Sequence, residues 1–169
     1  MDERDVAFDS ICRELYPRLV GALGLYTGSR DVGEELAQEA LARAWRKWKA
    51  FSTAHDPSAW VFVVAFNLAK SRGRRLQAER RALRRVAEGE TARSERSLAD
   101  EHDLRNALAR IPHRFRTVLV ARYYLGWTLQ ETADHLGVPL PTVKTWSARG
   151  IDRLRNDGFL NTMEAIDAG

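Results

Sequence analysis

The chain has 169 residues, of which 44% are apolar and 30% charged, so we expect one medium or two small soluble globular domains. No apolar run approaches the roughly 20 residues of a membrane helix, and the acidic start Met1–Asp5 does not resemble a secretory signal. The one cysteine, Cys12, cannot form an internal disulfide, which favours a reducing cytoplasm.

Apolar residues recur at helical spacing and strand-like alternation is absent, so the sequence predicts an all-α chain. The first predicted helix covers residues 6–26. A second begins after Ser29 or after Asp31 and runs to about Ala50, with Asp31 and Glu34 at the spacing of a capping box.

The second helix carries an acidic face beside its apolar row. This face is formed by Glu34, Glu35, Gln38 and Glu39. Acidic residues near a helix N-terminus are favoured by the helix dipole, which is one explanation. The other is a docking face for a basic partner protein, and the residues alone leave both open.

A loop over Phe51–His55 precedes the third predicted helix. Asp56 is placed to be its N-cap and Pro57 to be its first residue, as helix starts prefer. The helix runs to about Arg75 and can continue beyond it.

One face of this third helix combines an aromatic ring, an amide and basic groups. Steps of three or four residues place five side chains there: Trp60, Val63, Asn67, Lys70 and Arg74. The combination suits single-stranded DNA, because aromatic faces stack on unpaired bases while basic groups hold phosphates. The alternative is that Trp60 belongs to the core and Asn67 is a buried amide.

The next segment is basic and poor in large apolar residues. The net charge of the chain is +4, and between Lys70 and Arg85 eight Lys or Arg face only Glu79. Such a cluster favours a polyanion through counterion release, or else is a solvated helix face. Because apolar residues are few from 77 to 101, we predict a linker that can be part-helical.

We therefore predict two small helical domains joined by a flexible linker. The boundaries are a first domain over 1–76, a linker over 77–101, a second domain over 102–160 and a disordered tail over 161–169. The second domain is predicted to hold a helix to Ile111, a break at Pro112, a helix over 114–125 and two further helices, the last extending to about Phe159.

Those two further helices have the pattern of a helix-turn-helix. Thr128 and Glu131 have capping-box spacing, Ala133 is small enough for close helix packing, and Gly137 can end the first helix. Val143, Ile151 and Leu154 of the second helix can pack inward. Its candidate DNA contacts are Thr142, Lys144, Thr145 and Arg149. The alternative is an ordinary helical hairpin.

Signals for catalysis are weak. The four histidines are scattered, and the chain has neither a phosphate-binding glycine loop nor a nucleophile elbow. We therefore expect no enzyme, no cofactor and no metal. The one catalytic alternative is a magnesium-dependent nuclease that uses Glu34, Glu35 and Glu39.

Taken together, the motifs resemble bacterial RNA polymerase sigma factors of the extracytoplasmic-function type. The resemblance covers about Phe8 to Arg155 and is carried by a few segments in the family's order and spacing. These segments are Asp31–Trp45, Trp60–Lys70, Ile111–Pro112, Tyr123–Tyr124, Gly126–Thr128, Glu131–Gly137 and Thr142–Lys144.

The resemblance implies three binding faces and no chemistry. The face implied to dock on core polymerase is formed by Glu35, Gln38, Glu39, Arg43 and Trp45. The reader of the melted minus-ten element is implied to use Phe51, Trp60, Asn67, Lys70 and Arg74. The reader of the upstream minus-thirty-five element is implied to use Thr142, Lys144, Thr145, Trp146 and Arg149. The family often uses a restraining anti-sigma protein.

The sequence departs from the family pattern at three positions. Val63, Phe66 and Trp146 stand where arginine is common, so the promoter sequence does not carry over. Two rival functions stay open: a dimeric DNA-binding regulator that uses the same helix-turn-helix, and the nuclease. The expected function is a cytoplasmic sigma factor, with core RNA polymerase, promoter DNA and an anti-sigma factor as partners.

Overall fold

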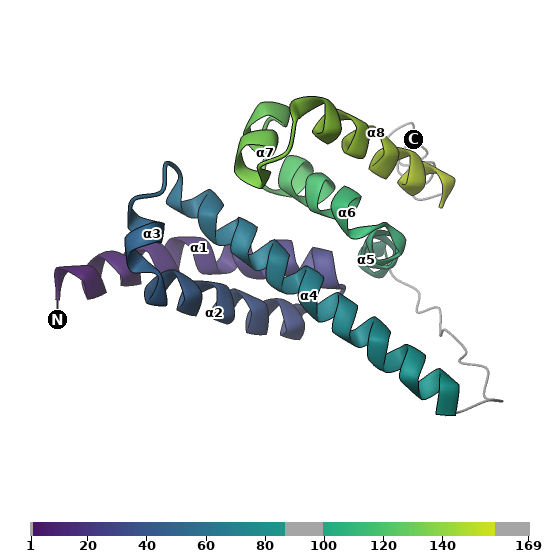
Figure 1. Ribbon diagram of the computed structural model, residues 1–169, viewed down its shortest axis with the longest axis horizontal. Helices are drawn as coiled ribbons and strands as arrows, with labels where there is room; N and C mark the ends of the chain where they lie inside the picture. The colour runs from purple at the N-terminus through teal and green to yellow at the C-terminus, as the bar shows by residue number, and fades with distance from the viewer. Residues whose placement is uncertain (1, 87–99, 158–169) are drawn as a thin grey trace.

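The computed structural model describes residues 2–86 and 100–157 (Figure 1). Every secondary-structure element in these residues is a helix, which confirms the predicted all-α class. The first half contains α1 (Glu3–Thr27), α2 (Arg30–Arg46), α3 (Trp48–Ser52) and α4 (Pro57–Val86). The second half contains α5 (Asp100–Arg110), α6 (His113–Leu119), the π-helical turn η1 (Val120–Tyr124), α7 (Leu129–Leu136) and α8 (Leu140–Asn156).

The helices α1, α2 and α4 pack side by side around one core. Its fully buried members include Leu19, Leu23, Phe62, Phe66 and Val61. The close approach of α1 and α2 depends on Gly33, because a Cβ there would lie 2.8 Å from the backbone nitrogen of Gly24. A side chain at Gly33 would therefore push the two helices apart.

The helix starts of the first half show one prediction that is confirmed and one that is wrong. Asp56 Oδ1 accepts a hydrogen bond of 2.9 Å from the Ala59 N–H, so it caps α4 as predicted. The cap of α2 is Ser29, whose Oγ accepts from the Val32 N–H at 3.3 Å. Asp31 lies inside the first turn of α2, so the predicted capping box of Asp31 and Glu34 does not form.

The predicted loop over Phe51–His55 begins instead as the short helix α3. The reason is aromatic packing that local spacing does not reveal. The ring of Phe51 lies 5.6 Å from that of Trp48 and 5.9 Å from that of Trp60, and it is only 1% exposed. Phe51 is therefore held in the core, and the connection to α4 shrinks to residues 53–56.

α4 is longer than the predicted third helix. It continues as one helix to Val86, so residues 77–86 of the predicted linker are helical. Ala, Arg, Leu, Gln and Glu fill this stretch and are strong helix formers even where no apolar face is buried. The rest of the linker prediction, over 87–99, and the predicted tail lie outside the described residues.

The second half forms the predicted helix-turn-helix on two supporting helices. Glu131 N–H donates to Thr128 Oγ1 at 3.0 Å, and Glu131 Oε2 accepts from the Thr128 N–H at 2.8 Å, so the capping box is confirmed. Gly137 ends α7 at φ 67°, in the left-handed region expected of it. Val143 of α8 is fully buried against Val118 and Ala133.

The helix predicted over 114–125 changes pitch in its middle. After α6 the chain makes the π-helical turn η1, in which the Leu125 N–H bonds to the Val120 carbonyl at 3.1 Å. This wider turn leaves Tyr123 and Tyr124 exposed while Val120 stays buried. It also brings the Tyr124 hydroxyl over Gly21 of α1, where a Cβ would collide with it.

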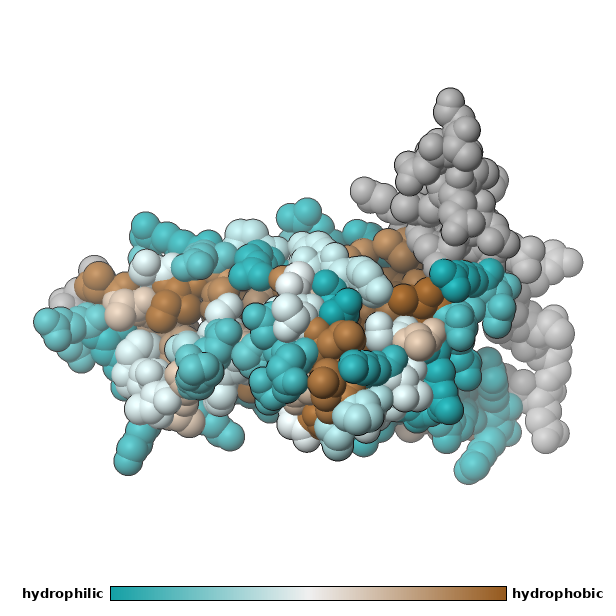
Figure 2. Space-filling view, turned by 90° about the horizontal axis from the view of Figure 1, so that it is seen from above, coloured by the Kyte–Doolittle hydropathy of each residue, from teal (hydrophilic) through white to brown (hydrophobic). Residues whose placement is uncertain are grey.

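The two halves pack directly on each other, with α5 and η1 against α1 and α7 against α4 (Figure 1). Val120, Leu125 and Trp127 join the core of the first half. On the face seen from above, hydrophilic side chains dominate, with smaller apolar areas between them (Figure 2). None of the helices in the described ranges has both the length and the apolar content needed to span a membrane.

Candidate nucleic-acid interface

The recognition helix α8 is held by its buried side and presents polar groups on the other. Val143 and Leu154 are buried, whereas Lys144, Thr145 and Arg149 are exposed. Thr145 Oγ1 donates to the Pro141 carbonyl at 3.0 Å, which fixes that hydroxyl on the helix surface. The predicted upstream contacts thus include three neighbouring exposed groups on a rigid helix, a geometry that fits a DNA groove.

The two remaining predicted contacts of α8 are less accessible. Thr142 is half-buried in the first turn. Trp146 is half-buried and packs against both apolar clusters of the second half. Inward packing therefore accounts for much of the surface of Trp146.

The residues predicted to contact melted DNA differ in exposure: some lie on the surface of α4 and others pack into the core. Asn67, Lys70 and Arg74 are exposed along one side of the helix. This exposure excludes the alternative of a buried Asn67 amide. Trp60 is half-buried with its ring against Phe51, and Phe51 has almost no surface to offer a base in this conformation.

The acidic face of α2 is neutralised by arginines from two helices, α2 itself and α4. Glu34 pairs with Arg30 at 3.1 Å, and Glu35 pairs with Arg72 of α4 at 2.9 Å. The face therefore carries mixed charge, which the acidic run in the sequence does not suggest. At these exposed sites each pair contributes little to stability, about 0–1 kcal/mol.

Glu39 lies between two arginines of its own helix. Its Oε1 accepts from Arg43 Nε at 3.0 Å and from Arg46 at 2.9 Å. The hydrogen bond from Arg43, with a further contribution from Arg46, lowers the pKa of the Glu39 carboxyl. Gln38 is exposed beside this cluster.

Trp45, the last residue of the predicted docking face, packs against α1. The Arg4 guanidinium lies 3.9 Å from the centre of the Trp45 ring and donates to the Trp45 carbonyl at 2.7 Å. Phe8 covers the ring at 5.1 Å. The indole is therefore a half-buried anchor between helices, with one edge left at the surface.

The candidate magnesium ligands do not converge. Each of the glutamates Glu34, Glu35 and Glu39 faces an arginine. Among the side chains that the structure describes, in residues 2–86 and 104–157, no three His, Cys, Asp or Glu are grouped as a metal site requires. This arrangement offers nothing to the nuclease alternative.

Contacts between the two halves were not predicted from the sequence. The Tyr26 hydroxyl at the end of α1 bonds to Nδ1 of His113, and Arg116 donates to the Tyr26 carbonyl at 3.1 Å. Burial, with a smaller effect of Arg116, lowers the pKa of His113 to about 4, so the ring is neutral at pH 7. Neutral Nδ1 can accept the hydrogen bond of the tyrosine.

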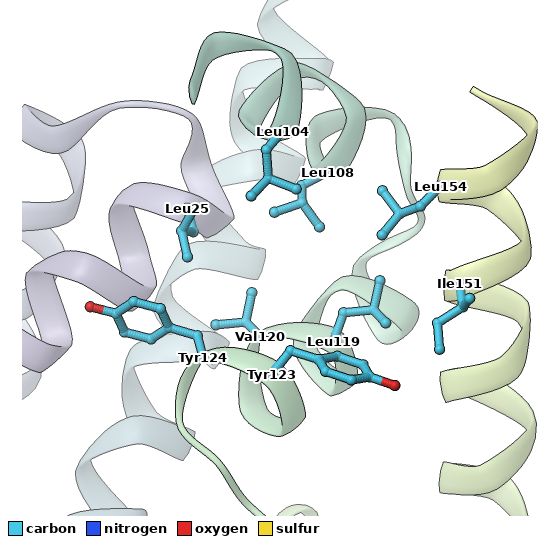
Figure 3. Close-up of a pocket in the computed structure, with 9 residues that line it drawn as sticks. All are labelled: Leu25, Leu104, Leu108, Leu119, Val120, Tyr123, Tyr124, Ile151 and Leu154. Carbon is cyan, nitrogen blue, oxygen red and sulfur yellow. The ribbon is translucent and has the colours of Figure 1, made fainter. Parts of the chain in front are cut away.

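An apolar hollow of about 540 Å³ lies next to these contacts (Figure 3). Leu25 of α1 faces Leu104 and Leu108 of α5 across it, and Ile151 and Leu154 of α8 form the opposite wall (Figure 3). The described residues that line the hollow are all apolar or tyrosine, a lining unsuited to a phosphate.

Comparison with known proteins identifies both halves. Residues 11–89 match the family described as sigma-70 region 2, and residues 107–156 match sigma-70, region 4. The chain is 32% identical over 152 residues to the ECF RNA polymerase sigma factor SigL of Mycobacterium tuberculosis, covering 80% of this chain and 82% of SigL. The chain belongs to the ECF sigma factors.

One further relative is similar in sequence and one solved structure is similar in fold. The ECF RNA polymerase sigma factor RpoE of Cereibacter sphaeroides is 29% identical, over 91% of this chain and 88% of that protein. The solved structure of the sigma factor RpoE in complex with the anti-sigma factor NepR from Bartonella quintana is similar in fold. Its TM-score is 0.71 at 22% identity, over 89% of this chain and 96% of that one.

Proposed function

We propose that this sigma factor binds core RNA polymerase in the cytoplasm and directs transcription initiation at particular promoters. The observation that carries the proposal is that two domains each expose a surface suited to DNA. One is the exposed face of α8, with Lys144 and Arg149. The other is the side of α4 that carries Asn67, Lys70 and Arg74. Polymerase supplies the chemistry, and this chain supplies the selection of the start site.

The upstream element is read as duplex by α8. Arg149 and Lys144 reach base edges and phosphates, Thr145 adds a short polar contact, and Thr142 lies at the helix start. Trp146 acts mainly by holding the helix on its domain, because much of its ring packs inward.

The minus-ten element is held after it melts. Asn67 reads an unpaired base while Lys70 and Arg74 hold neighbouring phosphates. Trp60 provides an aromatic surface at the beginning of the same side of α4, with Phe51 supporting it from beneath. A base pocket beside Phe51 requires that ring to move from its buried position.

Docking on polymerase uses the exposed side of α2. Gln38, Arg43 and the paired Glu35 and Glu39 form a surface of fixed, mixed charge, and Trp45 adds an apolar edge. A surface of mixed charge contributes more to the orientation and specificity of docking on polymerase than to its affinity.

Once both domains are held on one polymerase, binding of one DNA site raises the effective concentration of the other. The overall affinity for promoter DNA is then higher than that of either site alone.

An anti-sigma factor restrains the free protein. Support comes from the solved relative of the same fold, which was captured with an anti-sigma factor. The proposal implies that such a partner covers one or both DNA surfaces until a signal removes it. A stand-alone dimeric regulator remains the rival function, and it requires specific DNA binding without polymerase.

Run-off transcription with core polymerase tests the function directly. A mixed promoter library is transcribed with core enzyme alone, with the unaltered chain, and with a Gln38→Ala/Arg43→Ala variant. We expect new start sites only with the unaltered chain, and weaker association of the variant with core enzyme. Identical transcripts with and without the chain would refute the proposal, and specific footprints without polymerase would favour the regulator.

A further inference from the structure

The last part of α4 lies outside both cores. All residues from 73 to 86 are exposed, and this end of the helix extends well past the ends of α1 and α2 (Figure 1). Burial therefore contributes little to its stability over this stretch, although burial is what stabilises most helices in proteins. A helix kept in such a position is available to a partner.

The charges on this segment are not arranged as on an ordinary solvated helix. Surface helices commonly alternate charge sign one turn apart, because opposite charges at that spacing attract. Here Lys70 and Arg74, Arg80 and Arg84, and Arg81 and Arg85 are like-charged pairs one turn apart. None of the ion pairs of the described residues involves residues 73–86, and the nearest pair is that of Arg72 with Glu35. The uncompensated repulsion destabilises the helix until a polyanion neutralises it.

Four of these basic residues share one side of the helix. Steps of four and seven residues place Lys70, Arg74, Arg81 and Arg85 in one row, which continues the side that carries Asn67. At 1.5 Å per residue the distance from Asn67 to Arg85 is about 27 Å. That length matches about eight base pairs of duplex at 3.4 Å each.

The opposite side of the segment differs in chemistry. Leu76, Leu83 and Val86 are 42%, 67% and 88% exposed there, and Glu79 lies among them. Arg75, Arg80 and Arg84 lie between this side and the row. The row therefore carries the densest positive charge of the segment, and it is the side best suited to nucleic acid.

We propose that Arg81 and Arg85 bind the phosphate backbone of the duplex that adjoins the melted element. The inference rests on the proposed function, because it extends the DNA-binding side assigned there to Asn67, Lys70 and Arg74. The contact is to phosphates, so it adds affinity and register without reading sequence. Arg81 and Arg85 continue the side of α4 assigned to DNA, so we expect the polyanion that they bind to be DNA and not an anionic membrane.

Two charge-matched double variants test the inference in the assembled holoenzyme. Arg81→Gln/Arg85→Gln removes two charges from the row, and Arg75→Gln/Arg80→Gln removes two charges from other sides of the same segment. Glutamine keeps helix propensity, which circular dichroism verifies. Affinity is measured at several salt concentrations on a forked promoter DNA with adjoining duplex, and on a fork that lacks it.

We expect the row variant to bind the long fork about tenfold more weakly and to lower the salt slope by about 1 to 2, as loss of two phosphate contacts requires. The control variant should keep the slope of the unaltered protein. On the fork without adjoining duplex, the row variant and the unaltered protein should bind equally.

Equal behaviour of the two variants on the long fork would overturn the inference. So would a loss of binding to anionic phosphatidylserine vesicles with no change on DNA, since the polyanion would then be a membrane. If the unaltered chain fails to join core polymerase or to bind the promoter, the proposed function itself fails. The two failures are therefore distinguishable.

Discussion

Nε2 of His135 lies 3.7 Å from Oδ2 of Asp56, and the two residues belong to different domains. The other carboxylate oxygen of Asp56 caps α4 through the Ala59 N–H. One aspartate therefore both caps the start of α4 and contacts the helix-turn-helix. Beside it, the Trp127 ring lies 4.7 Å from His135 and 6.3 Å from Phe62. The domains are closed against each other at the beginning of α4.

Trp127→Ala should open this arrangement. The substitution removes a half-buried indole from the joint core and costs about 2 kcal/mol, less than a fully buried tryptophan. In Trp127→Ala the efficiency of energy transfer between dyes on α2 and α8 should fall. In Trp127→Phe most of that efficiency should be retained. Unchanged transfer in Trp127→Ala would show that other contacts hold the domains together.

The contact of His113 with Tyr26 makes stability depend on pH. Burial lowers the pKa of His113 to about 4, below the ordinary 6.5, so the unfolded chain binds the proton more readily. The stabilisation is present above pH 6.5 and is lost as pH falls toward 4. It amounts to about 1 kcal/mol after allowance for partial exposure.

Denaturant titrations at pH 7, 6, 5 and 4.5 measure this dependence. His113→Asn keeps an acceptor for the tyrosine but does not titrate, so its stability should vary less over this range. If the variant loses stability as steeply as the unaltered protein, another group is responsible.

Gly33→Ala should separate α1 from α2. The added Cβ would meet the Gly24 backbone nitrogen at 2.8 Å, and a backbone atom cannot yield as a side chain does. We expect the free energy of unfolding to fall by about 1–3 kcal/mol, as for other overpacked sites.

Gly73→Ala is the matched control, because a Cβ there meets nothing within 4 Å. It should stabilise the exposed end of α4 by about 0.5–1 kcal/mol. Chemical denaturation of both variants gives the comparison.

Arg149→Ala should weaken promoter binding through the upstream element by about 1–3 kcal/mol if a bidentate base contact is lost. Footprinting of the holoenzyme should show reduced protection there, with the minus-ten region retained. Arg155→Ala, on another side of α8, should leave the footprint intact. Full upstream protection in the Arg149 variant would remove that residue from the reader.

Local signals in the sequence predicted the local structure. Asp56 before Pro57, Thr128 three residues before Glu131, and Gly137 after α7 each specify a helix end through their own backbone contacts. The choice of Ser29 over Asp31 was left open because both types cap helices. The long α4 was underestimated because its final turns bury nothing, although their helix-forming composition was visible.

Long-range packing could not be predicted in this way. Phe51 is buried because Trp48 and Trp60 meet around it. Trp127 and His113 join the first domain through side chains far away in sequence. The paired state of Glu35 depends on Arg72 from another helix. Apart from Trp48 and Phe51, which are three residues apart, these partners lie too far apart in sequence for periodicity to detect.

The length of α4 beyond the core also amplifies any tilt of its packed end. Phe62 fixes the helix in the core, and Val86 lies about 36 Å farther along at 1.5 Å per residue. A tilt of about 10° at the fixed end would carry the tip through roughly 6 Å, given that length. A spectroscopic label near Val86 would therefore magnify small rearrangements of the bundle into a readily measured displacement.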